Sequence, residues 1–189
     1  MKGLIIAAGK GTRLAEMGDS KPLVRFLGIP LIEHVIHTAR AGGIREFNIV
    51  IGYNGEMIKN HLVPFAERNG IRIQFIFNPD WEEPNGISVL AAEKHLAEPF
   101  VLMMSDHLFD PEIVRELIAD GIDEGEVKLA IDKRIKDNPL IDIDDVTKVQ
   151  ESNGHIIEIG KHLIDYNAFD TGIFLCTPGI FDGLNRSIT

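Results

Sequence analysis

The chain has 189 residues, 44% of them hydrophobic and 25% charged, which fits one globular domain with a sizeable core. Its formal net charge of −10 argues against a general nucleic-acid binder, because such a protein carries a basic face. No apolar run approaches the roughly 20 residues that span a bilayer, and no signal-peptide pattern is present, so we expect a cytoplasmic protein without membrane insertion. The single cysteine, Cys176, fits a reducing compartment and is expected in the core.

Strands and helices alternate through the first two-thirds of the chain. Continuous apolar runs such as "KGLIIAA" predict strands buried on both faces, and apolar residues at helical spacing predict the helices between them. This alternation with short connections predicts an α/β fold with a mostly parallel sheet and helices on both of its faces. We expect strands at 2–8, 46–53, 72–77 and 100–106, and helices at 30–43, 55–70 (kinked at Pro64), 86–96 and 111–121.

After residue 126 the pattern changes to strands alone. Between two of these strands, Asn153 and Gly154 suit a type I′ hairpin turn. The polar, acidic stretch 135–145 predicts a loop. The expected strands lie at 127–132, 147–152, 155–160 and 169–176.

The stretch "AAGKGTRL", residues 7–14, follows directly on the first predicted strand. It is not a P-loop, because Lys10 is followed by Gly11 and not by Ser or Thr, and it lacks the third small residue of a dinucleotide fingerprint. Gly9 and Gly11 still allow the backbone to approach an anion closely, and Arg13 can grip phosphate oxygens with its planar guanidinium. The loop therefore predicts a phosphate site of another design.

Basic charge gathers around this loop although the chain as a whole is acidic. Residues 1–25 hold five lysines and arginines against two acids, which favours an anion site there. Pro22 fixes the backbone beside Lys21, which suits holding an ammonium group at a phosphate. The alternative is a strand-to-helix turn with solvated charges.

Two further strand ends carry polar residues. Asp106 ends an apolar strand, where a carboxylate is costly unless it is paired or binds a metal such as Mg²⁺; the alternative is a helix N-cap or structural acid. Asn85 and Gly86 either approach a base or ribose or begin a helix with an ordinary Asn N-cap, and Trp81 either walls the pocket or packs. Ligands of open parallel sheets bind beyond the carboxyl ends of strands, so these ends and the glycine loop are expected to converge.

The segments "LIIAAGKGTRL", "KPL", "NGIS" and the strand-end "SD" resemble the sugar-phosphate nucleotidyltransferases, over essentially the whole chain. "AIDKRI", "DIDDVTKVQE" and "IIEIGKHL" are further similar to archaeal-type CTP:inositol-1-phosphate cytidylyltransferases, which form one half of bifunctional enzymes that make di-inositol phosphate solutes. The resemblance implies a Rossmann-like three-layer α/β sandwich in a single domain, residues 1–189. Its nucleotide-binding part would be 1–125 and its acceptor-binding part 126–189.

The resemblance also implies the reaction and its partners. CMP would pass from CTP to inositol-1-phosphate with Mg²⁺ as cofactor, giving CDP-inositol and pyrophosphate. Members of the family often carry a fused membrane-embedded phosphotransferase domain, which would hold such a chain at the cytoplasmic face of a membrane. A homodimer is left open.

Individual residues receive roles from the same resemblance. Arg13 would hold the leaving pyrophosphate, Lys21 would neutralise charge on the α-phosphate and its attacker, and Asp106 would hold Mg²⁺. Lys161, Asp132 and Gly172 would bind the acceptor. The implied nucleotide-binding set is Ala7, Ala8, Gly9, Lys10, Gly11, Thr12, Arg13, Lys21, Asn78, Asn85, Gly86 and Ser88.

The sequence departs from the family pattern at its end. The family usually supplies a second metal-binding aspartate after the final strand, and this sequence reaches "NRSIT" before any such motif. We therefore expect CTP binding with slow turnover. Two other interpretations stay open, namely a nucleotidyltransferase for another base or acceptor, such as phosphocholine or a sugar-1-phosphate, and a catalytically idle nucleotide-binding regulatory domain.

Overall fold

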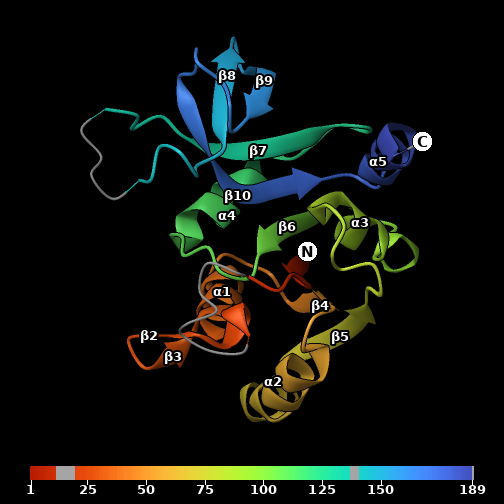
Figure 1. The fold of residues 1–189 in the computed structure, drawn as a ribbon. Coiled ribbons are helices and arrows are strands. Elements are labelled where there is room, and N and C mark those ends of the chain that lie inside the picture. The colour runs from red at the N-terminus through yellow and green to blue at the C-terminus, as the bar shows by residue number, and fades with distance from the viewer. Residues whose placement is uncertain (12–19, 137–140, 189) are drawn as a thin grey trace. The chain divides into compact units, whose positions relative to one another are not determined.

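The computed structural model describes residues 1–11, 20–136 and 141–188 (Figure 1). The predicted roles of Thr12 and Arg13 fall outside these residues. The chain forms two compact units, which are described separately. Unit 1 comprises residues 1–128 and 174–189, and unit 2 comprises residues 129–173.

Unit 1 is built on four parallel strands in the order β5-β4-β1-β6. The register sets Ile6 of β1 beside Val50 of β4 and Met104 of β6, so the strands end at a common edge. Strands β1, β4 and β6 are apolar and buried on both faces, as parallel strands covered on two sides require, whereas the edge strand β5 is partly exposed. The strands are β1 (Lys2–Ala7), β4 (Glu46–Ile51), β5 (Arg72–Phe77) and β6 (Phe100–Met104).

Helices cover both faces of this sheet (Figure 1). On one face, Val89 and Phe181 from two helices share a core cluster with Leu4 and Ile6 of β1. Helix α1 buries a stripe of apolar residues on the other side, where helical spacing places them on one face. The helices are α1 (Leu31–Ala41), α2 (Gly55–Asn69), α3 (Asn85–Leu90), α4 (Pro111–Asp120) and α5 (Gly179–Ile188).

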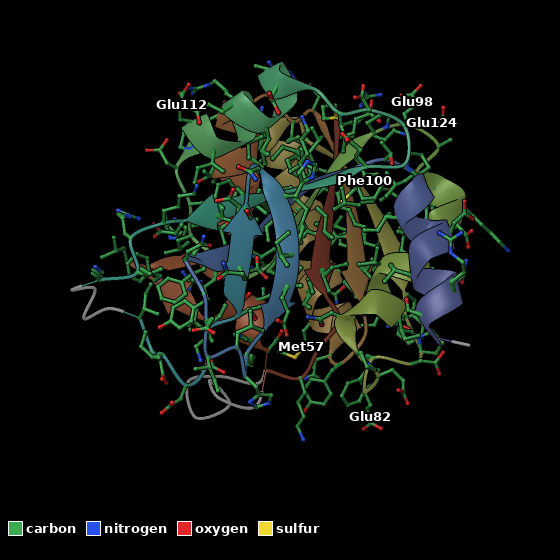
Figure 2. All side chains as sticks on the ribbon, turned by 90° about the horizontal axis from the view of Figure 1, so that it is seen from above. Met57, Glu82, Glu98, Phe100, Glu112 and Glu124 are labelled. Atoms are coloured by element: carbon green, nitrogen blue, oxygen red, sulfur yellow. The ribbon has the colours of Figure 1, made fainter. Side chains whose placement is uncertain are left out.

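Figure 2 shows all side chains, with apolar ones between the layers and charged ones at the surface. Phe100 of β6 is fully buried and stacks on Phe181, with ring centroids 5.8 Å apart. Glu82, Glu98 and Glu112 lie at the rim of the molecule, where their charges stay in water. The cluster that contains Phe100 and Phe181 is therefore an apolar layer between helices and one face of the sheet.

Unit 2 is an antiparallel arrangement. Strand β10 (Ala168–Cys176) pairs with β7 (Val127–Asp132) and with β8 (Lys148–Ser152), and β8 pairs with β9 (His155–Gly160). Strands β7 and β10 each have residues in both units. Asn153 and Gly154, with φ of 53° and 81°, form the left-handed turn between β8 and β9, as their sequence predicts.

The predicted α/β class, all eight predicted strands and the four predicted helices are confirmed. Three details differ. Helix α2 contains Pro64 as predicted but ends one residue earlier, at Asn69, with Gly70 as its left-handed C-cap. The helix predicted at 86–96 ends at Leu90 and is followed by a 3₁₀ turn at Glu93–His95, and α5 was not predicted.

Short elements also escaped prediction. These are a two-stranded hairpin of β2 (Arg25–Phe26) and β3 (Ile29–Pro30), and a 3₁₀ turn at Lys21–Leu23. The compact units divide near the expected boundary at 126, but residues 174–189 return to unit 1. Within the part of the chain that is described, no helix is long and apolar enough to cross a membrane.

Cys176 lies in the core, as predicted, and burial raises the pKa of its thiol to about 12. The thiolate that reacts with a disulfide reagent is therefore scarce in the folded protein at neutral pH. We expect Cys176 to react with Ellman's reagent at pH 8 at least about 100-fold more slowly than in urea. Equal rates in the two conditions would contradict this burial.

Candidate active site

Backbone hydrogen bonds carry the pairing of the parallel strands beyond their ends. The amide of Tyr53 donates to the carbonyl of Ala8 (2.9 Å), and the amide of Ser105 donates to the carbonyl of Ile6 (3.2 Å). The amide of Asn78 donates to the carbonyl of Ile51 (2.8 Å). The segments that follow β4, β5 and β6 are thus each bonded to the end of a neighbouring strand or its loop, and the predicted convergence of strand ends is confirmed for unit 1.

The glycine loop after β1 is shaped by its contact with Lys21. Gly11 has φ of +64°, and a Cβ atom there would lie 2.5 Å from Cβ and 2.7 Å from Cδ of Lys21. Both the backbone conformation and the lack of space therefore require glycine. Among the described residues outside its chain neighbours, none has an atom within 4 Å of the Cβ position at Gly9, so this part of the loop is open toward the described structure.

Lys21 and Asp106, predicted from separate segments, form an ion pair. Their side chains are 25% and 18% exposed, so the pair lies at the border of the protein and solvent. His107 places Nδ1 3.6 Å from the other carboxylate oxygen of Asp106. The helix-cap alternative for Asp106 is wrong, because Asp110 caps α4 by accepting from the amide of Glu112 (2.9 Å).

Asn78 and Ser88 lie in the interior, 2% and 3% exposed. The Asn78 amide nitrogen donates to Ser88 Oγ (2.9 Å), and its side-chain oxygen accepts from the backbone amide of Asp80 (2.9 Å). These bonds hold the 78–88 loop against the sheet. In this geometry both side chains position the loop, and their predicted contact with nucleotide remains a prediction.

Asn85 and Gly86 begin helix α3. The N-cap is Pro84, without a side-chain cap, so the interpretation of Asn85 as an N-cap is wrong. Asn85 is exposed, and a Cβ atom at Gly86 would lie 3.2 Å from Cδ2 of Leu184 in α5. Close packing on α5 is thus one reason for glycine at this position.

Three residues of the site were missed or left open by sequence reasoning. Gly52 follows β4, and a Cβ atom there would lie 2.5 Å from Cβ of Trp81 and 2.9 Å from the carbonyl oxygen of Ala8. Tyr53 packs its ring 5.1 Å from the ring of Trp81, and Lys10 Nζ lies 5.5 Å from the centre of the Tyr53 ring. The glycine loop is therefore joined to an aromatic pair. The signal was the "GY" that ends the predicted strand 46–53.

The described residues fit a magnesium ion that is held mainly by phosphates. They contain no cluster of three or more His, Cys, Asp or Glu side chains placed to hold a metal. Mg²⁺ in phosphoryl-transfer sites commonly uses one or two carboxylates with substrate phosphates and water. The partly exposed carboxylate of Asp106 meets that need, with Lys21 as its present partner.

The predicted acceptor residues all belong to unit 2. Lys161 pairs with Asp145 at 2.8 Å. Gly172 has φ of +73° within β10 and donates its amide to Asp170 Oδ1 (2.6 Å), which explains glycine there. Arg134 donates three hydrogen bonds of 2.9 Å to Asp132. The side-chain bonds from Arg134 lower the pKa of Asp132, which stays ionised.

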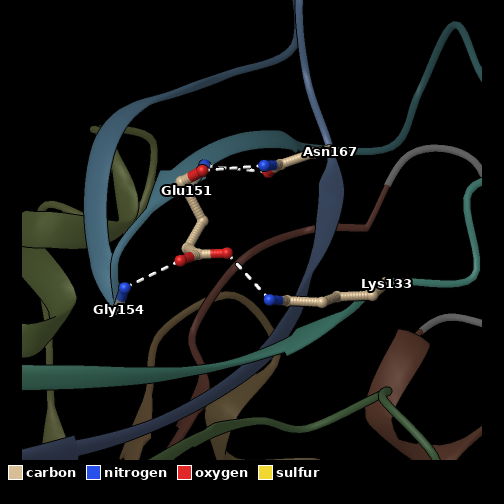
Figure 3. A network of polar contacts seen from close by, with 4 residues as sticks. All are labelled: Lys133, Glu151, Gly154 and Asn167. Atoms are coloured by element: carbon tan, nitrogen blue, oxygen red, sulfur yellow. Dashed lines mark hydrogen bonds and ion pairs between the residues drawn. The ribbon is translucent and has the colours of Figure 1, made fainter.

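A polar network rigidifies the β8–β9 hairpin of unit 2 (Figure 3). Glu151 exchanges backbone–side-chain hydrogen bonds with Asn167, at 2.8 and 2.7 Å. Its carboxylate accepts from Lys133 Nζ (2.8 Å) and from the amide of Gly154 (2.7 Å). The bond from Lys133 is the main cause of a lowered pKa at Glu151, so the network persists at neutral pH.

Parallel strands ending in a glycine loop, a lysine and a carboxylate define an α/β protein of the Rossmann-like nucleotide-binding type. Residues 3–146 match the model of the MobA-like NTP transferase domain, and the chain belongs to that family. The family prediction is confirmed.

Curated relatives and solved structures extend the match over most of the chain. The "Bifunctional IPC transferase and DIPP synthase" of Rubrobacter xylanophilus is 39% identical over 97% of this chain, and that of Thermococcus kodakarensis is 31% identical over 95%. The chain spans 40% and 38% of the lengths of these relatives. The structure of the inositol-1-phosphate CTP transferase from T. maritima superposes with a TM-score of 0.82 at 28% identity, covering 96% of this chain and 72% of that one.

Gly52→Ala tests the packing of the loops at the strand ends. The added methyl group has no space between Trp81 and Ala8, so we expect a loss of about 1–3 kcal/mol of stability and a lower melting temperature. Gly183→Ala in α5 is the matched control, because nothing lies within 4 Å of its Cβ position and alanine favours a helix. Equal melting temperatures for the two variants would contradict the described contact.

Proposed function

We propose that this chain transfers CMP from CTP to inositol-1-phosphate, releasing pyrophosphate and forming CDP-inositol. The observation that carries the proposal is the contact of Lys21 with Asp106, beside Gly11 of the glycine loop. The match to the T. maritima inositol-1-phosphate CTP transferase and the names of the curated relatives support the choice of base and acceptor.

The reaction requires the protein mainly to align the two substrates and to neutralise the charge of their phosphates. A phosphate oxygen of the acceptor, already anionic, attacks the α-phosphorus of CTP. The bond from that phosphorus to the oxygen bridging to the β-phosphate breaks, and pyrophosphate leaves with the electron pair. No general base has to remove a proton, so alignment and charge neutralisation make up the catalysis.

Three described residues of unit 1 have a part in that step. The open backbone at Gly9 receives the triphosphate, and the ammonium of Lys21 neutralises charge that gathers at the α-phosphate. Asp106 would hold Mg²⁺, which would shield the phosphate charges from one another. The Lys21–Asp106 pair opens easily in exchange, because an ion pair this near solvent contributes on the order of 1 kcal/mol.

We assign the acceptor to unit 2, where Lys161, Asp132 and Gly172 are the predicted contacts. Inside the described residues the lone cysteine is a buried free thiol, which fits a cytoplasmic location. These assignments follow from the same proposal and are tested with it.

A substrate panel tests the proposal. Pyrophosphate release is measured with CTP, UTP, GTP and ATP, each with inositol-1-phosphate, glucose-1-phosphate, mannose-1-phosphate or phosphocholine, and products are identified by mass spectrometry. We expect the highest kcat/KM for CTP with inositol-1-phosphate. A different best pair would overturn the substrate assignment but keep the reaction. No release from any pair would indicate a regulatory domain that binds nucleotide without turnover.

Lys21→Ala tests the role of the ion pair in turnover. Removing one cation from the transition state typically slows such a reaction about 10²–10³-fold, while the melting temperature changes little because the side chain is outside the core. Lys128→Ala is the matched control, since Lys128 also pairs with a carboxylate, Asp120, at 2.5 Å in unit 1. Unchanged turnover of Lys21→Ala would show that Lys21 is only a surface charge.

A further inference from the structure

Lys148 of unit 2 is a buried cation without an acidic partner among the residues that the structure describes. The residue is 8% exposed and begins strand β8, where it lies opposite Gly160 of β9 and Phe169 of β10. Pairing with a strand on each side fixes its backbone. No sequence pattern singled it out, because "TKVQES" reads as an ordinary strand.

The ammonium group of Lys148 makes neutral contacts. Nζ donates to the carbonyl oxygen of Lys161 (2.8 Å) and lies 5.7 Å from the centre of the Tyr166 ring. Across the described ranges 1–11, 20–136 and 141–188, no carboxylate forms an ion pair with it. An ammonium has three N–H donors, and one described protein acceptor, the Lys161 carbonyl, bonds to it, so two donors are left for water or a ligand. A buried charge in this state is costly unless an anion compensates it.

The nearby Lys161 is, in contrast, exposed and paired with an acid. Lys161 is 45% exposed by side chain, and its charge is met by Asp145 at 2.8 Å. The backbone of Lys161 faces Lys148 through its carbonyl, so the two lysines belong to one local structure. Of this pair, Lys148 is the cation whose charge is uncompensated.

We propose that Lys148 is the principal phosphate-binding residue of an anion site in unit 2, and that its ligand is the phosphate monoester of the acceptor. This rests on the proposed function. Phosphate oxygens carry the negative charge and accept hydrogen bonds from the two remaining N–H groups. Lys161 then serves as an exchangeable second cation that leaves Asp145 when the anion binds.

Lys148→Met removes the charge and keeps an unbranched stem of similar volume. Binding of inositol-1-phosphate and of inorganic phosphate is measured by calorimetry without CTP, and the melting temperature is measured without ligand. We expect phosphate binding to weaken at least about tenfold, because the charged donor that bonds to the phosphate is removed. The ligand-free melting temperature should hold or rise, because a buried unpaired charge is removed.

Two variants accompany it. Lys148→Arg keeps the cation and should retain most of the phosphate binding. Lys133→Met removes an exposed lysine of the same unit, paired with Glu151, and should bind phosphate like the wild type.

The outcomes separate this inference from the proposed function. Wild-type affinity in Lys148→Met, an equal loss in Lys133→Met, or the absence of phosphate binding by the wild type would overturn it. A Lys148→Met chain that melts much lower or fails to fold would also overturn it, because a structural role would then explain the burial. Phosphate binding that is lost in Lys148→Met, in a protein that releases no pyrophosphate, would uphold the anion site and contradict the proposed function.

Discussion

The parallel pairing of β1 with both β4 and β6 is the constraint on which the rest of the site depends. Parallel strands end at the same edge of a sheet. The pairing of the strands therefore brings the loops that follow them together. The backbone bonds from Tyr53 to Ala8 and from Ser105 to Ile6 continue that pairing into the loops. Lys21 and Asp106 reach each other because Lys21 packs on the loop after β1, and Asp106 follows β6.

The electrostatics of this edge follow from the same placement. Without a ligand, the lysine and the carboxylate neutralise each other near solvent. In the proposed function, a triphosphate with a cation would offer each of them a stronger partner, so binding would exchange one ion pair for two new contacts. Unit 2 presents a contrasting case. Its buried Lys148 contacts a carbonyl and an aromatic ring, and no acidic residue in the described part of the chain pairs with it. The Lys21–Asp106 ion pair suits a site that exchanges partners when a ligand binds. The arrangement at Lys148 suits a site whose cation is neutralised by a bound anion.

Much of the fold could be predicted from the sequence, because the spacing of apolar residues and the positions of glycines indicate local structure. The runs that form β1, β4, β5 and β6 predicted a parallel sheet, and the sheet then predicted that Lys21 and Asp106 converge. The reason for Gly11 was only partly readable. It is required by the stem of Lys21 and by its own positive φ, not by approach of a ligand alone. Asn78 and Ser88 looked like ligand contacts, yet they bond to each other in the interior. Lys148 gave no usable signal, because its importance lies in what packs against it across the fold. The "GY" at Gly52 was interpreted only as the end of a strand, because its contacts with Trp81 and Ala8 come from distant parts of the sequence.

In the proposed function, Lys21 and Asp106 act together on the same triphosphate. A double-mutant cycle of pyrophosphate release, with Lys21→Met, Asp106→Asn and the double variant in single-turnover conditions, measures this most directly. Residues that serve one step together are not additive, so the double variant should be about as slow as the slower single variant. Single effects that multiply in the double variant, or a wild-type rate in Asp106→Asn, would contradict the account.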